Sequence, residues 1–452
     1  MTRIISYFEE KIGVPFFKVF ALLLVLFFLW GFMLGLFDVL NKHLGGLISL
    51  DSTKHILMLL TYYAGYLLMP IPASLFAERY SYKKGFIFGL LVFATGTFMF
   101  IPTSQFHSFP LFLFSLFAIS MGMAALETVV NPYTTLVGKP KYATFRITLG
   151  QSFTSLGWLF GPFVGASILF DVREKVSIVQ TNEFTAMTVP YVGIGILVVL
   201  IVVMLLVTDL PNINGEKVRS LTLNNPEEKS ISIYKRGYFV TAFITMFFYM
   251  AAKTAVFGIY IMYLLDLFKS LSDHSVIGNE FLLKIVHLIA KTNELNETVY
   301  KSVATVLFVF IGMGMYTVGR FIGSFILIKF KPNILLVLSS VFSLLFSMII
   351  WLNLGIISFI ALCLLTLSIS TMFPVIFSLG IRKMGYKTKR ASAHIIMAIV
   401  GGGMFPLLVG VLPAISPVNI GLSILVVSFV VTFFYGFKGY KIGRITRTKL
   451  NL

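Results

Sequence analysis

The chain has 452 residues, of which 58% are hydrophobic and only 12% are charged, and its formal net charge is +18. A soluble domain typically has about 25% charged residues, because polar side chains must cover its surface. The composition therefore excludes an ordinary soluble enzyme and a disordered chain, and it indicates a polytopic membrane protein.

Twelve apolar segments follow one another along the chain. Each is long enough to cross a bilayer as a helix, which takes roughly 17–25 residues. Lipid offers no partners to open backbone groups, and runs of this kind lack the alternation of barrel strands. The sequence therefore predicts an all-α polytopic membrane protein with 12 transmembrane helices, over residues 17–40, 56–77, 85–102, 110–137, 147–170, 188–208, 238–265, 302–329, 333–352, 354–380, 392–413 and 417–437.

The basic residues divide the loops into two sets. If both termini lie in the cytoplasm, 27 of the 36 Lys and Arg residues fall on the inner side, 8 fall on the outer side, and Lys253 lies within a helix. This count assigns Arg320 to the inner side. The asymmetry is the one that the positive-inside rule describes, so we expect a multi-pass protein of the cell (inner) membrane. We interpret the positive charge as an orientation signal and expect no nucleic-acid partner.

A polar stretch over residues 209–236 divides the helices six and six. We interpret it as a cytoplasmic linker between an N-terminal half, 1–208, and a C-terminal half, 237–452. The longest outer stretch follows the seventh segment, and the apolar spacing of residues 277–292 predicts a short interfacial helix there.

The two halves share a proline pattern. Pro132 and Pro162 flank a basic loop in the first half, as Pro374 and Pro406 do in the second. Two parallel six-helix halves are typical of the major facilitator fold, in which the substrate binds between the halves near the middle of the membrane.

Three charged residues, Asp38, Glu127 and Lys253, fall inside the predicted helices. A charge in hydrocarbon is costly, so each should face a cavity or a partner. At about 1.5 Å per residue, Asp38 lies towards the outer mouth, where contact with water or Lys42 is the alternative, and Glu127 and Lys253 lie near the middle. Glu127 and Lys253 are expected to form an ion pair across the cavity, which could also be purely structural.

Polar side chains accompany these charges at helical spacing. Asn131 lies one turn from Glu127 on the fourth segment, and Tyr249 lies one turn from Lys253 on the seventh. Desolvation disfavours an ionised carboxylate, so Glu127 is a candidate proton carrier. The fifth segment adds Gln151 and Thr154, whose groups suit a polyhydroxylated ring, although polar side chains in membrane helices also serve packing.

Other functional classes have no visible motif. The sequence contains no G-x-x-x-x-G-K-[ST] phosphate loop and no H-E-x-x-H or G-x-S-x-G motif. We expect no enzyme activity, no cofactor and no metal site.

Four segments resemble one transporter family. FFLWGFMLGLFDVLNKH (27–43), GMAALETVVNPYTTLVG (122–138), FRITLGQSFTSLG (145–157) and MFPVIFSLGI (372–381) are similar to sequences of the fucose:proton symporter family of the major facilitator superfamily, which includes L-fucose permeases and glucose/galactose permeases. The resemblance covers nearly the whole chain. It implies a major facilitator fold and sugar transport coupled to protons.

The resemblance also implies roles for single residues. Asp38, eight residues after Trp30, matches the family acid linked to proton coupling, and Glu127 matches the acid linked to sugar binding and protonation. By the same matching, the family's two amides fall on Asn131 and Gln151. Two positions depart from the family: Thr154 stands where it has Asn, and Lys253 stands where the fucose permease has Gln.

These observations predict uptake of a hexose or 6-deoxyhexose, of the L-fucose, glucose or galactose type, by proton symport with alternating access. The residues expected to contact sugar are Trp30, Glu127, Asn131, Gln151, Thr154, Tyr249 and Lys253, and those expected to carry the proton are Asp38 and Glu127. Lys253 leaves open an uncoupled or differently coupled carrier, sodium included, or one for an acidic sugar. A further alternative is a non-transporting membrane receptor or assembly factor. We expect a monomer in the lipid bilayer.

Overall fold

The computed structural model describes residues 17–47, 52–106, 108–179, 183–208, 210, 232–269, 297–382, 384–412 and 414–443, together with residues 284, 286, 288 and 289. The described residues are helical apart from short turns, and every predicted apolar segment falls on one of these helices. Ten helical stretches are long and apolar enough to cross a membrane, and Tyr191–Val207 is a shorter apolar helix. The predicted all-α fold is therefore confirmed.

The first six segments form the helices α2 to α9. Two of these segments are broken into a pair of helices, at Pro70 and near Met99. The bounds are α2 (Phe17–Leu47), α3 (Ser52–Leu68) with α4 (Pro70–Arg79), α5 (Tyr82–Phe98) with α6 (Phe100–Phe106), α7 (Phe109–Leu136), α8 (Ala143–Val179) and α9 (Glu183–Val207). Helices α2 and α8 run beyond the predicted ends, since a helix satisfies its own backbone after the apolar run stops.

The last six segments form α12 to α21. Three of them are interrupted: by a π-helical turn at Phe308–Met313, by a break before Pro374, and by a 3-10 segment over Ala398–Gly403, where consecutive glycines weaken the helix. The bounds are α12 (Gly237–Lys269), α14 (Glu297–Leu307) with α15 (Gly314–Lys329), α16 (Pro332–Trp351), α17 (Ile356–Ile369) with α18 (Met372–Gly380), α19 (Thr388–Met397) with α20 (Met404–Val411), and α21 (Pro417–Phe437).

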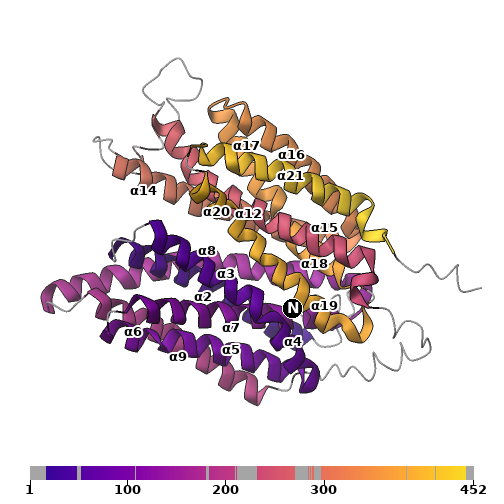
Figure 1. The fold of residues 1–452 in the computed structure, drawn as a ribbon, viewed down its shortest axis with the longest axis horizontal. Coiled ribbons are helices and arrows are strands. Elements are labelled where there is room, and N and C mark those ends of the chain that lie inside the picture. Colours follow the sequence, from indigo (N-terminus) through magenta and orange to yellow (C-terminus); the bar gives the residue numbers. More distant parts are fainter. Residues whose placement is uncertain are drawn as a thin grey trace, which may run out of the picture.

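Figure 1 shows these two sets of helices as two lobes lying side by side. Between the lobes, α8 packs against α15 and α18, α19 packs against α4 and α7, and the 3-10 segment packs against α3. Most residues of the predicted linker 209–236 and of the predicted interfacial helix 277–292 lie outside the described residues, so both remain predictions.

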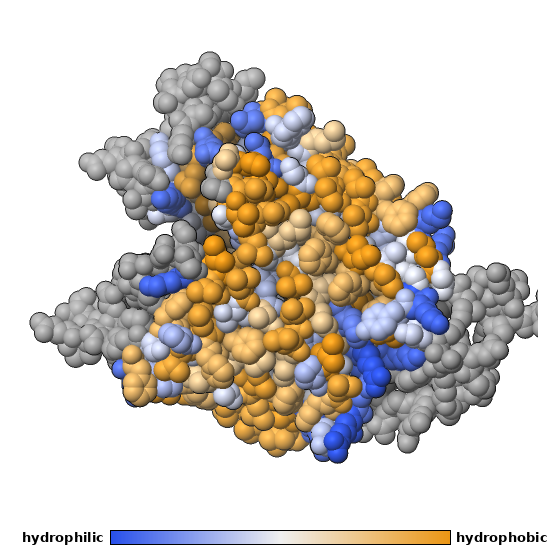
Figure 2. Space-filling model, in the orientation of Figure 1, coloured by the Kyte–Doolittle hydropathy of each residue, from blue (hydrophilic) through white to orange (hydrophobic). Residues whose placement is uncertain are grey.

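The lobes are joined at the end of the molecule that carries the loop after α4 and the start of α19, here called the basic end. Lys389 Nζ donates to the carbonyl oxygen of Ala77 at 2.6 Å, and Arg390 Nη2 lies 3.0 Å from Glu78 Oε2. The Thr144 and Ser378 hydroxyls are 2.7 Å apart. Figure 2 shows hydrophilic residues gathered at this end, beside a broad hydrophobic surface over the middle of the molecule.

Glycines set the close approach of α2 and α8 inside the first lobe. A Cβ atom on Gly31 would overlap the carbonyl oxygen of Thr154, and one on Gly157 would overlap the carbonyl oxygen of Phe28. The backbones can touch only because these positions lack side chains. This contact brings Trp30 on α2 next to Thr154 on α8.

Candidate functional site

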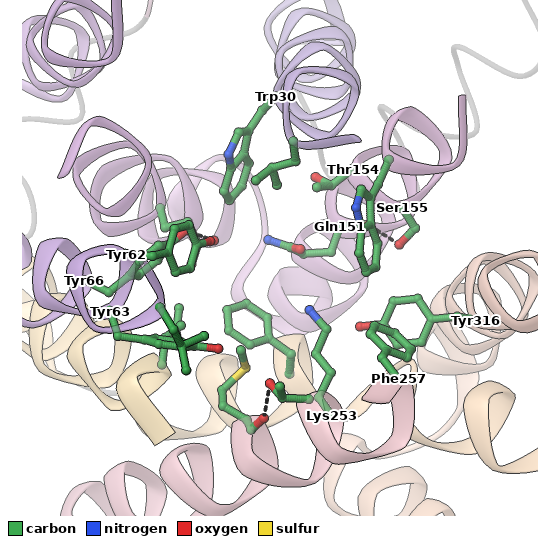
Figure 3. Close-up of a pocket in the computed structure, with 18 of the residues that line it drawn as sticks. Trp30, Tyr62, Tyr63, Tyr66, Gln151, Thr154, Ser155, Lys253, Phe257 and Tyr316 are labelled. Carbon is green, nitrogen blue, oxygen red and sulfur yellow. Dashed lines mark hydrogen bonds between the residues drawn. The ribbon is translucent and has the colours of Figure 1, made fainter. Parts of the chain in front are cut away.

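A cavity of about 490 Å³ lies between the two lobes. The volume falls in the range of small-molecule sites, roughly 300–1,000 Å³. Both lobes line it (Figure 3), and its polar lining comes from α2, α3, α7, α8, α12 and α15. The polar or aromatic residues that line it include Trp30, Tyr62, Tyr63, Tyr66, Glu127, Gln151, Thr154, Ser155, Trp158, Lys253, Thr254, Phe257, Tyr316 and Arg320.

Three polar atoms of the lining residues are buried without a partner among the residues that the structure describes. They are Trp30 Nε1, Glu127 Oε2 and Thr154 Oγ1. The other carboxylate oxygen of Glu127 accepts a long hydrogen bond from the Tyr66 hydroxyl, at 3.4 Å. A buried polar group without a partner costs about 1–3 kcal/mol. The three atoms are themselves covered, so a ligand reaches them, and recovers that energy, only when their side chains turn towards the cavity. The set offers one donor, one acceptor and one hydroxyl that can do either.

Gln151 and Asn131 form a linked pair of amides. Gln151 lines the cavity, and its Nε2 donates to Asn131 Oδ1 at 3.1 Å. Asn131 is fully buried and is not part of the cavity lining. The structure therefore places Asn131 behind Gln151, where it orients that side chain.

Tyr249 does not line the cavity either. It is fully buried, and its hydroxyl donates to the carbonyl oxygen of Ile369 at 3.2 Å. Tyr249 lies one helical turn from Lys253 on the same side of α12, but its ring packs among the helices of the second lobe. The backbone of Asp38 belongs to α2, while its side chain lies outside the described residues.

Lys253 extends from α12 into the cavity, with its ammonium group pointing towards Gln151 (Figure 3). Its Nζ lies 5.4 Å from the ring centroid of Trp158 and 5.9 Å from those of Phe257 and Tyr316. Cation–π contacts of this kind contribute about 0.5–2 kcal/mol each. Among the described residues no ion pair joins Lys253 to Glu127 within 4.0 Å. The expected ion pair is therefore wrong for this structure: Lys253 lies among three rings instead.

Arg320 is a cavity residue, contrary to the prediction from the sequence. The count of basic residues places it on the inner side, but it lies within α15, is 4% exposed and lines the cavity. Its Nη1 donates to the carbonyl oxygen of Gln151 at 2.7 Å and to Ser155 Oγ at 2.8 Å, its Nη2 donates to the Tyr316 hydroxyl at 2.7 Å, and its Nε donates to the carbonyl oxygen of Ser370 at 3.0 Å. The sequence does indicate a position inside the membrane, because Arg320 precedes Lys329 by nine residues of one apolar run, about 13 Å along a helix.

The charges of the cavity do not cancel. Its lining contains two cations, Lys253 and Arg320, and one carboxylate, Glu127, and the other lining residues are neutral. Every hydrogen bond given above for Arg320 goes to a neutral oxygen. No cluster of metal-binding side chains occurs among the described residues.

Comparison with known proteins places this arrangement in a family. The family model described as Major Facilitator Superfamily matches residues 19–393. The chain is 29% identical to the glucose/galactose transporter of Brucella abortus over 419 residues, 93% of each chain. It is 28% identical to the L-fucose-proton symporter of Escherichia coli over 398 residues, 85% of this chain and 84% of that one.

The fold agrees with this sequence similarity. A crystal structure of a variant of the E. coli fucose:proton symporter FucP is similar, with a TM-score of 0.74 and 25% identity, covering 93% of this chain and 98% of that one. FucP in the outward conformation is similar to the same degree, with a TM-score of 0.74 and 27% identity over 92% and 97% of the two chains. The resemblance drawn from the four sequence segments is confirmed. This multi-pass, all-helical membrane protein belongs to the major facilitator superfamily.

Proposed function

We propose that this protein takes up a hexose or 6-deoxyhexose together with a proton, by alternating access of a cavity between its two halves. The observation that carries the proposal is the trio of unpartnered polar atoms, on Trp30, Glu127 and Thr154, in the wall of a cavity of about 490 Å³. A sugar hydroxyl both donates and accepts, so one monosaccharide can satisfy all three when their side chains turn towards it. The relatives named for glucose/galactose and L-fucose transport support the substrate class.

The residues take different roles in this proposal. Trp30, Glu127, Gln151, Thr154 and Lys253 line the cavity and contact the sugar. Behind this lining, Asn131 and Tyr249 support it, Asn131 through its hydrogen bond with Gln151 and Tyr249 through its packing against the second lobe.

Glu127 carries the coupling proton, because its carboxylate is buried in the cavity wall and has one oxygen without a partner. Asp38, which the family resemblance links to proton coupling, passes the proton to or from the outer side.

Alternating access is supported by where the halves touch. The hydrogen bond from Lys389 and the ion pair of Arg390 join the two halves at the basic end. If the basic end faces the cytoplasm, as the charge distribution favours, these contacts close the inner side of the cavity. Release of the sugar then requires these contacts to break while the opposite end closes. We propose a monomer in the inner membrane with both termini cytoplasmic, halves over 1–208 and 237–452, and a linker over 209–236.

Transport into proteoliposomes tests the proposal. Purified protein is reconstituted, and uptake of labelled L-fucose, D-glucose and D-galactose is measured with and without an inward proton gradient. We expect at least one of these sugars to accumulate above its outside concentration only when the gradient is present. Equal uptake in both conditions would exclude proton coupling, and no uptake of any monosaccharide in either condition would exclude sugar transport.

A further inference from the structure

We propose that the preferred substrate of this cavity is a six-carbon sugar bearing a carboxylate, a hexuronate, and that Lys253 binds this carboxylate. The inference rests on the proposed function, since it needs a monosaccharide that enters with a proton, and it replaces the neutral hexose by a hexuronate as the preferred substrate. It goes further by assigning the charge of the substrate and the residue that recognises it.

The charge of the cavity is the starting point. Two cations and one carboxylate line it, so its formal charge is +1 when Glu127 is ionised. A neutral sugar leaves this charge uncompensated in a partly desolvated space between apolar helices. A sugar with one carboxylate brings the sum to zero when Glu127 is ionised and to +1 when Glu127 carries the proton, in both cases one unit lower than with a neutral sugar.

Lys253 is the cation that remains available. The Arg320 guanidinium already donates to Gln151, Ser155, Tyr316 and Ser370. The Lys253 ammonium makes no hydrogen bond within the described part of the chain. It lies over three ring faces and interacts with Glu127 only through electrostatics at more than 4.0 Å, and its side chain is partly exposed to the cavity. An ammonium has three donors and no acceptor, so its best partner is an anion that accepts more than one hydrogen bond, as a carboxylate does.

The surroundings of Lys253 fit the rest of a sugar ring. Trp158 and Phe257 flank the ammonium with flat apolar faces, against which the C–H side of a pyranose can pack. Gln151, Trp30 and Thr154 present polar groups in the same cavity, and they are suited to hydroxyls (Figure 3). The carboxylate at one end of the sugar and the hydroxyls along it thus meet different parts of the lining.

The three rings stabilise the Lys253 ammonium but do not neutralise its charge, which takes an anion. Glu127 is the carboxylate that lines the cavity, and it does not pair with Lys253 in the described structure. Its Oε1 is instead bonded to the Tyr66 hydroxyl. The two charged side chains therefore line the cavity from different halves of the protein, Glu127 from α7 and Lys253 from α12.

The charge of the substrate also determines how much net charge crosses the membrane in each transport cycle. A neutral hexose entering with one proton moves one positive charge inward. A hexuronate anion entering with one proton moves no net charge. Transport of the proposed substrate is therefore driven by the pH difference alone and is insensitive to a membrane potential.

The test is uptake by proteoliposomes of the full chain, with labelled D-glucuronate and D-galacturonate against D-glucose, D-galactose and L-fucose. For the wild type we expect hexuronate uptake at least tenfold above that of any neutral sugar, unchanged by a valinomycin-induced potassium potential. For Lys253→Gln we expect hexuronate uptake to fall by roughly 30-fold or more, the size expected when one partner of a buried charge pair is truncated. Neutral sugars should compete better in this variant.

Two further variants keep the test decisive if Lys253→Gln is poorly folded. Lys253→Arg preserves the charge and should retain hexuronate binding within about tenfold, because Arg also donates to carboxylates. Lys438→Gln removes an exposed lysine of the basic end and should leave uptake unchanged. Binding is followed separately as the rise in melting temperature of each variant with D-glucuronate, since a ligand that binds only the folded state stabilises it.

The outcomes separate this inference from the proposed function. If the wild type accumulates neutral hexoses and ignores both hexuronates, the inference is overturned and sugar transport stands. A Lys253→Gln protein that transports hexuronate as the wild type does would also overturn it, because the carboxylate would then bind elsewhere. If neither class of sugar is taken up, both proposals fail.

Discussion

Arg320 of α15 donates a hydrogen bond of 2.7 Å to the main-chain carbonyl oxygen of Gln151 in α8, and so joins the two lobes beside the cavity. The same Gln151 presents its side chain to the cavity and is bonded to Asn131 behind it. One residue of the second lobe thus holds the backbone of a ligand-facing residue of the first. This relationship couples the shape of the cavity to the relative position of the lobes.

Replacing Arg320 is expected to impair transport more than stability. In Arg320→Gln the bonds to Gln151 and Tyr316 are lost, but so is a buried guanidinium that is expensive to desolvate, so the change in free energy of unfolding should stay within about 2 kcal/mol. Uptake should fall by at least about tenfold. Proteoliposome uptake and thermal melting in detergent check the two parts. Wild-type transport in Arg320→Gln, with Arg382→Gln as the exposed control, would contradict a coupling role.

Glu127→Gln is expected to separate binding from proton coupling. The amide keeps the size of the carboxylate and can still accept the hydrogen bond from Tyr66, but it cannot take up a proton at neutral pH. Accumulation driven by a pH gradient should fall at least about tenfold, while exchange of internal for external sugar stays within a few-fold of the wild type. The measurement is a comparison of gradient-driven uptake with counterflow. Undiminished accumulation would assign the proton to another residue, and Asp38→Asn is the parallel variant.

Lys389 is expected to hold the basic end closed. Its Nζ donates to the carbonyl oxygen of Ala77 at 2.6 Å and lies 4.4 Å from the Tyr82 ring centroid. A hydrogen bond to a charged group contributes about 1.5–3 kcal/mol, so Lys389→Met should shift the populations roughly tenfold towards opening of this end. Arg390→Gln should shift them less, because the Arg390–Glu78 pair is 58% and 24% exposed and such pairs contribute about 0–1 kcal/mol.

Distances between spin labels report this opening. Cys363 is the single cysteine of the chain and is buried, so Cys363→Ser provides a background for labels at Lys141→Cys and Lys441→Cys, both exposed at the basic end of different lobes. A distance distribution that does not change in Lys389→Met would show that the lobes are held together by other contacts.

Gly31→Ala is expected to damage both stability and the cavity. Its methyl group would sit 1.9 Å from the carbonyl oxygen of Thr154, so α2 and α8 must separate. Overpacking of this kind costs about 1–3 kcal/mol or more and moves Trp30 away from Thr154. Gly193→Ala is the matched control, because a Cβ there meets nothing within 4 Å. Thermal melting should show a clear loss for the first variant and no loss, or a small gain, for the second.

The sequence predicted the fold because membrane helices are specified by local features. Every predicted apolar segment falls on described helices, and the broken segments have recognisable causes, such as Pro70 or the glycines at 401–403. The site could be predicted only in part. Glu127, Gln151, Thr154, Lys253 and Trp30 do line one cavity.

The prediction for Arg320 is wrong because a count of charges by loop treats every basic residue near a helix end as an orientation signal. Helical spacing predicts that Tyr249 and Asn131 face the cavity, but it identifies a side of a helix and not the element that packs on that side. In the folded protein the Tyr249 hydroxyl meets the carbonyl oxygen of Ile369, and the Asn131 amide meets the side chain of Gln151.

Hydrophobicity and the distribution of basic residues along the chain determined the class of protein, the order of its helices and the presence of charges at membrane depth. These properties depend only on the residues of each segment, so the sequence is enough to predict them. The tertiary structure alone decided which polar groups meet: Lys253 lies among three rings instead of beside Glu127, and Arg320 joins the two lobes at Gln151. Those contacts depend on how closely the helices approach and cross, which is set by contacts between residues far apart in the chain, such as Gly31 and Thr154.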